Sequence, residues 1–280
     1  MIQERALAPN RNYITLSENM KKHFVTAIAF LAITTAALAQ KKDSVATSIV
    51  KPAAPAPTTA NSGKKDWSKV TLGKRANDHF MFQLGYDNWA QATDSMHIKG
   101  FNRSANFYFM FDFAFKTDPR FSVGAGLGIG SSNIFFNKQN LQIAGNTQTL
   151  TFADESNSDH WKKFKLVTTY LEAPIELRFA MDPENTNSSW KFAVGAKIGL
   201  LLSAHTKGKT RQNSFGQTIG NYTEKIASKQ YFNSTKLAAT ARISKGVFGI
   251  FGQYQINSLL KSTAGPSVFP YSFGIMLSGL

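Results

Sequence analysis

The sequence of 280 residues contains no cysteine. This absence excludes disulfide bonds, zinc–thiolate sites and a lipid-carrying cysteine behind a leader. Acidic residues are also few, with 17 Asp and Glu against 32 Lys and Arg, so the formal net charge is +15. Such a basic chain often binds nucleic acid or an anionic membrane surface. Because the lysines are spread over predicted loops and termini and accompany no nucleic-acid motif, we expect no nucleic-acid partner.

Long apolar runs are scarce as well. The most marked one, residues 24–38, follows a Lys-Lys-His sequence and ends in Ala-Leu-Ala. A basic start, a short apolar centre and an Ala-x-Ala end are typical of a secretory signal peptide, here cut after Ala39. The run is too short, and too rich in Ala and Thr, for a membrane-spanning helix. We therefore predict that residues 1–39 are an amino-terminal extension and signal peptide, with translation starting at Met20.

The next stretch, residues 40–77, is rich in Pro, Ala and Lys and includes Lys51-Pro-Ala-Ala-Pro-Ala-Pro-Thr-Thr-Ala60. Such a composition cannot bury enough apolar surface to fold. We predict a disordered periplasmic tether over residues 40–77, followed by a folded domain over residues 78–280.

The clearest pattern within that domain is Tyr170-Leu-Glu-Ala-Pro-Ile-Glu-Leu-Arg-Phe179, in which every odd position is apolar. A period of two separates two faces of a β-strand, which no helix does. A soluble sandwich would bury the apolar face in its core. A membrane barrel would turn the same face toward lipid and keep the charges in a polar lumen.

Eight segments share this alternation, and most of the 23 phenylalanines lie in them. Each is about ten residues long, the length that a tilted strand needs to cross a bilayer. The segments are residues 79–87, 106–115, 121–130, 170–179, 190–203, 236–243, 248–256 and 271–280.

The connections between these segments alternate strictly in length. The short ones are residues 116–119, 182–189 and 244–246, and the long ones are about 90–103, 137–165, 206–234 and 257–270. Membrane barrels keep all short turns on one side and all long loops on the other. The chain therefore predicts an all-β fold, an eight-stranded antiparallel transmembrane β-barrel with short periplasmic turns and long extracellular loops in the cell outer membrane.

The composition of the two faces supports this interpretation. The face opposite the aromatic one is rich in Gly, Ser, Asn, Gln and isolated charges, and a soluble core cannot be built from it. Hydrocarbon outside and polar side chains inside satisfy both faces. On this basis arginine should be tolerated better at Tyr108, on the lumen face, than at Phe109, on the lipid face. Eight strands leave a lumen just filled by side chains, so a general porin is not expected.

Six charged residues share the predicted lumen face. They are Asp112, Glu172, Glu176, Arg178, Lys197 and Arg242. A narrow interior cannot hydrate them all, so we predict that they pair as a structural plug, with a catalytic carboxylate pair as the alternative. The short turn sets Lys197 opposite Pro174 and within reach of both glutamates. Proline cannot donate to the ladder, which predicts a bulge or a weakened hydrogen bond at Pro174.

Three other motifs carry less weight. The segment Gly124-Ala-Gly-Leu-Gly-Ile-Gly130 lacks the third glycine of a dinucleotide fingerprint, and is better explained as a strand that leaves room for Tyr108 or Asp112. The sequence Gly208-Lys209-Thr210 lacks the first glycine of a P-loop. A solvated loop explains the cluster of Asp154, Glu155, Asp159 and His160 better than a cation site does, because the EF-hand spacing is absent. We predict no metal site and no cofactor.

A catalytic grouping is conceivable at the outer end of residues 190–203. Ser203, His205 and Glu172 could hydrolyse a lipid ester by nucleophilic attack. Ser203 and His205 have lumen parity, whereas lipid chemistry needs access to the outer leaflet, so we assign no catalytic residue. A lipid-modifying or hydrolytic barrel enzyme and a narrow ion-conducting barrel remain as alternative functions.

Three segments carry a resemblance to a known family: residues 170–178, residues 197–207 and Pro270-Tyr-Ser-Phe-Gly-Ile275. They resemble the PorT-like outer-membrane β-barrel family, over residues 78–280. The resemblance implies an eight-stranded outer-membrane barrel without catalytic residues, and one member of the family is an accessory of the type IX protein secretion system. It implies a non-enzymatic role in protein secretion or envelope assembly. The expected partners are outer-membrane lipid, the barrel assembly machinery during biogenesis, and secretion-system proteins.

Overall fold

The computed structural model describes residues 79–186 and 188–279. The predicted signal peptide at residues 1–39 and the predicted tether at residues 40–77 lie outside these described residues. Within the described ranges, no helix is long and apolar enough to cross a membrane.

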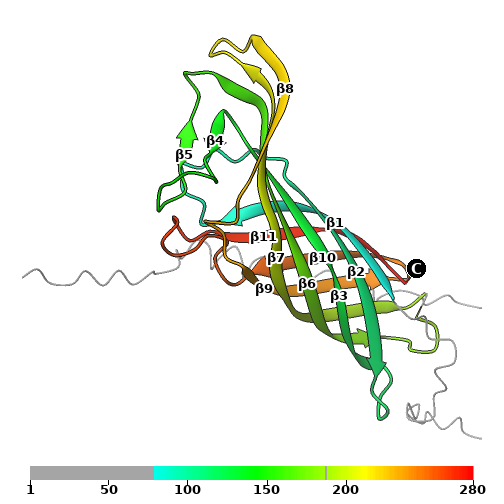
Figure 1. Cartoon of the computed structure of the whole chain (residues 1–280). Coiled ribbons are helices and arrows are strands. Elements are labelled where there is room, and N and C mark those ends of the chain that lie inside the picture. The colour runs from blue at the N-terminus through cyan, green and yellow to red at the C-terminus, as the bar shows by residue number, and fades with distance from the viewer. Residues whose placement is uncertain (1–78, 187, 280) are drawn as a thin grey trace, which may run out of the picture. The chain divides into compact units, whose positions relative to one another are not determined.

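The described chain is built from antiparallel strands (Figure 1). The strands are β1 (Phe80–Ala90), β2 (Arg103–Ala114), β3 (Phe121–Phe136), β4 (Gln139–Leu141), β5 (Phe152–Asp154), β6 (His160–Ala180), β7 (Trp190–Gln212), β8 (Thr218–Ala227), β9 (Thr235–Lys245), β10 (Phe248–Gln255) and β11 (Phe269–Ser278). The main sheet has the order β6-β3-β2-β1-β11-β10-β9-β7-β8, and β6 also pairs with β7. This additional pairing closes a ring of eight strands, with β8 outside it. The predicted eight-stranded antiparallel barrel is confirmed.

The ring has two different ends. One end, here the turn end, carries the short connections 115–120, 181–189 and 246–247 together with residues 79 and 279. The other, the loop end, carries the connections 91–102, 137–159, 213–234 and 256–268. Strand β8 pairs with the part of β7 that runs past the loop end, and the two form a hairpin that projects away from the ring (Figure 1).

Three strands are longer at the loop end than the alternation predicted. Strand β3 continues to Phe136, β6 begins at His160, and β7 continues to Gln212. The predicted loops 137–165 and 206–234 are therefore wrong in extent. They contain strand extensions as well as β4, β5 and β8. The extensions of β6 and β7 escaped prediction because their outward faces carry lysines instead of the apolar residues that mark a lipid-facing strand, and the β3 extension did so because Ser131 and Asn133 interrupt its outward face.

The outside of the ring is apolar over the lengths that were predicted. Burial alternates along β2, and its outward residues between Ala105 and Phe113 are all exposed. The exposed side chains, here the apolar band, include Phe82, Phe107, Phe111, Leu127, Ile175, Val194, Leu200, Ile250 and Ile275. Such a continuous apolar surface is far larger than an exterior in water carries.

The lumen is filled by side chains. A cluster of Met81, Tyr108, Met110, Phe251 and Met276 packs within the ring, and Tyr108 has no exposed surface. The predicted lumen face thus supplies apolar side chains as well as the polar ones that dominate its composition. The lumen parity predicted for Tyr108 and the lipid parity predicted for Phe109 are confirmed, and arginine at Tyr108 also carries a packing cost because that side chain lies in a close-packed interior.

The loop end is closed by a second apolar cluster, here the cap. It joins residues of the loops to the ends of the barrel strands. Its buried members include Trp89, Phe136, Leu141, Ile143, Trp161, Phe232, Leu260 and Val268. The connections at this end are thus packed into a core instead of lying in solvent.

A β-bulge interrupts the pairing of β6 with β7. Thr169 lies opposite Ser203 while Tyr170 lies opposite Leu201, so Leu202 is one extra residue in β7. At Pro174 the register does not shift, but Ala173 and Pro174 have no partners in the β3–β6 ladder. The weakened pairing predicted at Pro174 is therefore confirmed on the β3 side, whereas the bulge lies elsewhere.

Candidate functional site: the charged lumen

The lumen holds two charge clusters. The one nearer the loop end, here the upper cluster, surrounds Glu172 of β6. Its carboxylate is almost fully buried, and Lys236 of β9 lies 2.8 Å from Oε1. The hydroxyl of Tyr108 donates a hydrogen bond of 2.5 Å to Oε2. Gly130 lies against this carboxylate, and an added Cβ there would overlap it. The glycine face of β3 thus makes the space in which Glu172 meets partners from β2 and β9.

Lys197 of β7 belongs to the same cluster. It lies opposite Pro174, as the turn length predicts, and it is almost fully buried. Its Nζ donates hydrogen bonds of 2.7 Å to the Tyr108 hydroxyl and 2.7 Å to Oε1 of Gln253, and lies 3.7 Å from Oε2 of Glu172. Lys197 was predicted to be within reach of both glutamates. Its ammonium lies near Glu172, whereas Glu176 forms ion pairs with Arg178 and Arg242.

The second charge cluster lies nearer the turn end, and is here called the lower cluster. It surrounds Glu176 of β6. Arg242 of β9 approaches Oε2 with Nη2 at 2.8 Å and Nε at 3.0 Å. Arg178 donates from Nε to the same oxygen at 3.1 Å, and its Nη1 lies 3.4 Å from Oδ1 of Asp112. The guanidinium of Arg178 covers Gly124, where an added Cβ would overlap it. Two arginines therefore neutralise two carboxylates near the turn end.

The six predicted lumen charges thus fall into two groups. Glu172 and Lys197 belong to the upper cluster, and Asp112, Glu176, Arg178 and Arg242 to the lower one. Sequence reasoning missed Lys236 and Tyr108 as partners of Glu172. Both have the lumen parity of their strands, which was the available signal, but the register of β9 against β7 and β6 was needed to place Lys236.

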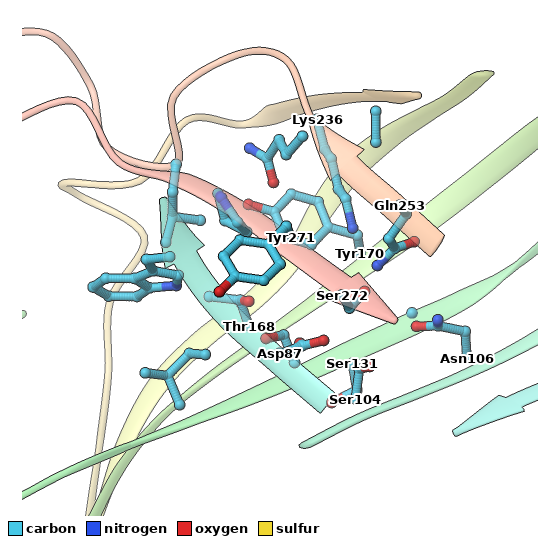
Figure 2. A pocket seen from close by; sticks show the side chains of 18 of the residues that line it. Asp87, Ser104, Asn106, Ser131, Thr168, Tyr170, Lys236, Gln253, Tyr271 and Ser272 are labelled. Atoms are coloured by element: carbon cyan, nitrogen blue, oxygen red, sulfur yellow. The ribbon is translucent and has the colours of Figure 1, made fainter. Parts of the chain in front are cut away.

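A small cavity lies beside Lys236 of the upper cluster, and Asp87, Ser104 and Ser272 are among the residues that line it (Figure 2). Its volume is about 30 Å³. The buried Oδ1 of Asp87, the hydroxyls of Ser104 and Ser272, and the hydroxyl of Tyr170 have no hydrogen-bond partner among the described residues. A polar cavity of this size holds one or two water molecules. Asp87 also contributes to the charge balance of the lumen. The two clusters and the cavity together then contain four carboxylates and four cations.

The comparisons with known proteins can be set beside this geometry. Residues 70–256 match the family described as outer membrane protein beta-barrel domain. The chain belongs to this family. No curated protein matches the chain.

Two solved structures of Ail, the attachment invasion locus protein of Yersinia pestis, are similar to this chain. The first, in complex with the heparin analogue sucrose octasulfate, is 14% identical with a TM-score of 0.32 and covers 71% of this chain and 95% of its own. The second is 15% identical with a TM-score of 0.29, over the same shares of the two chains.

Membership in the outer membrane protein beta-barrel domain family gives the barrel its orientation. The apolar band lies in the hydrocarbon of the outer membrane. Short turns face the periplasm and long loops the exterior in such barrels, so the turn end is periplasmic and the loop end extracellular. The extensions of β6 and β7 above Tyr170 and Leu202, together with β8, then lie outside the hydrocarbon.

The conceivable catalytic grouping of this outer-membrane barrel is not assembled. The extra residue Leu202 reverses the parity of β7, so that Leu201 and Ala204 point inward and His205 does not. The lumen parity inferred for Ser203 and His205 is therefore wrong, because they lie opposite the outward residues Thr169 and Val167 of β6. Glu172 is engaged by Tyr108 and Lys236, and no hydrogen bond joins it to His205 or Ser203 among the described residues.

The carboxylates of the acidic loop cluster accept hydrogen bonds from neighbouring residues of the chain. Asp154 accepts hydrogen bonds from the backbone N–H and hydroxyl of Ser156, and Glu155 accepts one from Arg211 at 3.4 Å. In the part of the chain that is described, no three His, Cys, Asp or Glu side chains are grouped to hold a metal ion.

Proposed function

We propose that this outer-membrane barrel is a non-enzymatic accessory of protein secretion or envelope assembly, of the PorT-like type, and that its β7–β8 hairpin is the contact surface for a protein partner. The barrel anchors the hairpin, and the charged lumen stabilises the barrel. The observation that carries the proposal is a set of exposed apolar side chains far from the hydrocarbon.

Those side chains lie along the hairpin beyond the loop end. Phe215 at the tip is 88% exposed, and Ile219 and Tyr222 of β8 are 54% and 53% exposed. Exposed apolar groups outside a membrane are typical of protein interaction sites. Aromatic residues in particular contribute much of the affinity of such sites.

The tip is held in one conformation by its own hydrogen bonds. Oδ1 of Asn213 accepts from the backbone N–H of Phe215 at 3.1 Å and of Gln217 at 2.9 Å. Gly216 has a φ of 81°, a left-handed conformation that glycine adopts without strain. Gln212 donates to the carbonyl of Gly216 at 2.6 Å. A preorganised tip loses little entropy when a partner binds.

A groove at the base of the hairpin adds to this surface. Its volume is about 330 Å³, and its lining includes Asn140, Trp161, Arg211, Tyr222 and Glu224. The rings of Trp161 and Tyr222 meet edge to face at a centroid distance of 5.3 Å. Aromatic and Arg side chains beside a polar rim are the composition that protein interfaces favour.

The lumen acids support the non-enzymatic part of the proposal. Glu172 and Glu176 are each shared between two cations, so neither is free to move a proton to a substrate. A general base must instead lie within hydrogen-bond reach of the substrate proton.

The test uses a strain that lacks the gene, complemented with the full chain. We expect the strain to lose secreted or surface proteins and the wild-type chain to restore them. A Phe215→Ser, Ile219→Ser, Tyr222→Ser variant should not restore them, although it still reaches the outer membrane. Cross-linking in outer-membrane fractions should yield a protein partner with the wild type that this variant loses.

The matched control changes polar residues of the same hairpin, Gln217→Ser, Asn221→Ser and Thr223→Ser. It should behave as wild type. Full complementation by the apolar variant would refute the proposed contact surface. An altered lipid profile in the deletion strain, with normal secretion, would favour a lipid-modifying enzyme instead.

A further inference from the structure

The outward face of the β6–β7–β8 extension is strongly basic. Lys163 lies opposite Lys209, and Lys165, Lys207 and Lys225 lie abreast on three neighbouring strands. His205 lies beside them, opposite Val167 and Ala227. Cross-strand partners share one face of a sheet. We define the basic face as Lys163, Lys165, His205, Lys207, Lys209 and Lys225.

The extension, as far as the structure describes it, places no acidic side chain on this face. Apart from the basic face, its outward residues are Val167, Thr169, Ser203, Thr223 and Ala227. Among the described residues, none of the five lysines forms an ion pair with a carboxylate, and Lys165 donates instead to Asn133 at 2.7 Å. Like charges directly opposite each other destabilise a sheet. A stable arrangement therefore calls for an anion from outside the chain.

Burial and the same repulsion between cations lower the pKa values of two groups of the basic face. Partial burial, followed by the neighbouring charges of Lys207 and Arg103, lowers the pKa of Lys165. Partial burial, followed by Lys225, Lys165 and Lys207, lowers the pKa of His205. A bound phosphate would reverse the effect of the charges on both groups.

The position of the face indicates the source of that anion. The same outward sides of β6 and β7 are apolar up to Leu171 and Leu202, and lysines follow five to eight residues nearer the loop end. A tilted strand rises about 3.3 Å per residue along its axis, which places the backbones of these lysines roughly 13–20 Å above the apolar band. Lipid head groups border this zone from below, and the long lysine side chains reach toward them.

The edge of the same surface carries aromatic side chains. The guanidinium of Arg103 lies 5.1 Å from the ring centroid of Phe101 and 5.5 Å from that of Phe135. Nζ of Lys165 lies 5.7 Å from the Phe135 ring. Aromatic rings beside cations are typical of the level where a membrane meets water.

From these observations we infer that the basic face binds the phosphate groups of the phosphorylated glycolipid of the outer leaflet, as a lipid-docking surface on one side of the barrel. Several separated lysines suit several phosphates on adjacent lipids, because each ammonium acts as a point charge. This inference does not depend on the proposed partner of the hairpin tip.

The test titrates diphosphoryl lipid A into the full chain in dodecyl maltoside micelles and measures the dissociation constant by thermophoresis. A Lys165→Gln, Lys207→Gln, Lys225→Gln variant should bind about 100-fold more weakly, because each cation near an anionic lipid contributes about fivefold. Lipid A stripped of its phosphates should show the same weak binding to the wild type and to the variant.

The charge-matched control, Lys162→Gln, Lys229→Gln and Lys261→Gln, removes three lysines from other surfaces and should leave the affinity unchanged. A Lys165→Arg, Lys207→Arg, Lys225→Arg variant should retain tight binding, which shows that charge and not misfolding is responsible. The inference is overturned if the glutamine variant binds as tightly as wild type, if the control loses as much, or if dephosphorylated lipid A binds equally well.

Discussion

Each glutamate in the lumen lies between two cations that come from different strands. Glu172 contacts Lys197 of β7 and Lys236 of β9, and Glu176 contacts Arg178 of β6 and Arg242 of β9. A buried pair is strongly destabilised when one partner is removed, because the other charge remains without compensation. A second cation on each acid reduces that penalty without removing it.

Lys197→Met tests which glutamate the buried ammonium supports. We expect a loss of about 3 kcal/mol in the free energy of unfolding, at the lower end of the range for a broken buried pair, because Lys236 stays on Glu172. In a double-mutant cycle, Glu172→Gln should recover part of this loss, whereas Glu176→Gln should add to it independently. Urea unfolding in detergent measures all variants. If Lys197 proves equally coupled to Glu172 and to Glu176, the prediction is wrong, because the ammonium of Lys197 lies 3.7 Å from Glu172 and Glu176 is paired with the arginines.

His205 offers a test by pH. Its pKa lies below the ordinary value of 6.5 through partial burial and then through Lys225, Lys165 and Lys207. The unfolded chain therefore binds a proton at higher pH than the folded chain, so stability falls as the pH drops below about 6.5. Lys225→Gln should raise the pKa of His205, and Lys229→Gln should not, as followed by NMR titration of the imidazole. The same His205 pKa in all three proteins would show that Lys225 does not act on it.

Among the elements, β7 combines two surfaces with opposite requirements. Up to Leu202 its outward side is apolar, and beyond the bulge its outward side carries His205, Lys207 and Lys209. Without the extra residue, these three side chains would have the inward parity of Leu201. The bulge therefore allows one continuous strand to face lipid below and carry cations above, while Ala204 packs in the cap and Thr206 stays buried.

The lipid face of β2 can be tested at two depths. Phe109→Arg places a cation within the apolar band and should cost about 2–4 kcal/mol in the free energy of unfolding. Ala105→Arg, on the same face but four residues nearer the loop end, should cost about 0–1 kcal/mol because it lies near the interface. Unfolding in phospholipid vesicles measures both. Similar costs at the two positions would mean that Phe109 is not near the bilayer midplane.

Most of the ring could be predicted from the sequence, because lipid outside and polar groups inside impose alternation on every strand. Where the strands leave the membrane this contrast between an apolar and a polar face is lost, and the strand extensions there were not predicted. The extensions of β6 and β7 place lysines outside and apolar cap residues such as Phe164 inside, which resembles an ordinary loop composition. The bulge at Leu202 depends on pairing with Thr169, and nothing in the local sequence of β7 marks it. Lys236 was overlooked because its contact with Glu172 joins residues 64 positions apart.

At the scale of the whole molecule, the lumen is filled from end to end. The two charge clusters, the apolar cluster that contains Tyr108 and Met110, and the cap together occupy the interior of the barrel. The cavity beside Asp87 has a volume of only about 30 Å³. An interior of this kind supports the barrel and leaves little room for solute.

Planar-bilayer recording tests the filled lumen. We expect no resolved conductance steps from the wild-type chain, because an eight-stranded interior is just filled by its side chains. A Met81→Ala, Met110→Ala, Met276→Ala variant should open part of the lower lumen and should show more current than a Phe82→Ala, Leu84→Ala, Ile275→Ala control on the lipid face. Large, stable steps from the wild type would favour the narrow ion-conducting barrel.

The charge clusters also constrain how the protein reaches the membrane. Glu172 meets Lys236 across 64 positions, and Lys197 meets Tyr108 across 89. Contacts of such long range form late in folding, because loop-closure entropy opposes them until the intervening strands are in place. Until the ring closes, the acids and bases of an open sheet would have no partners, and their entry into hydrocarbon without water would cost several kcal/mol each. We therefore expect insertion and ring closure to be coupled, with water in the lumen until the last strand pairs.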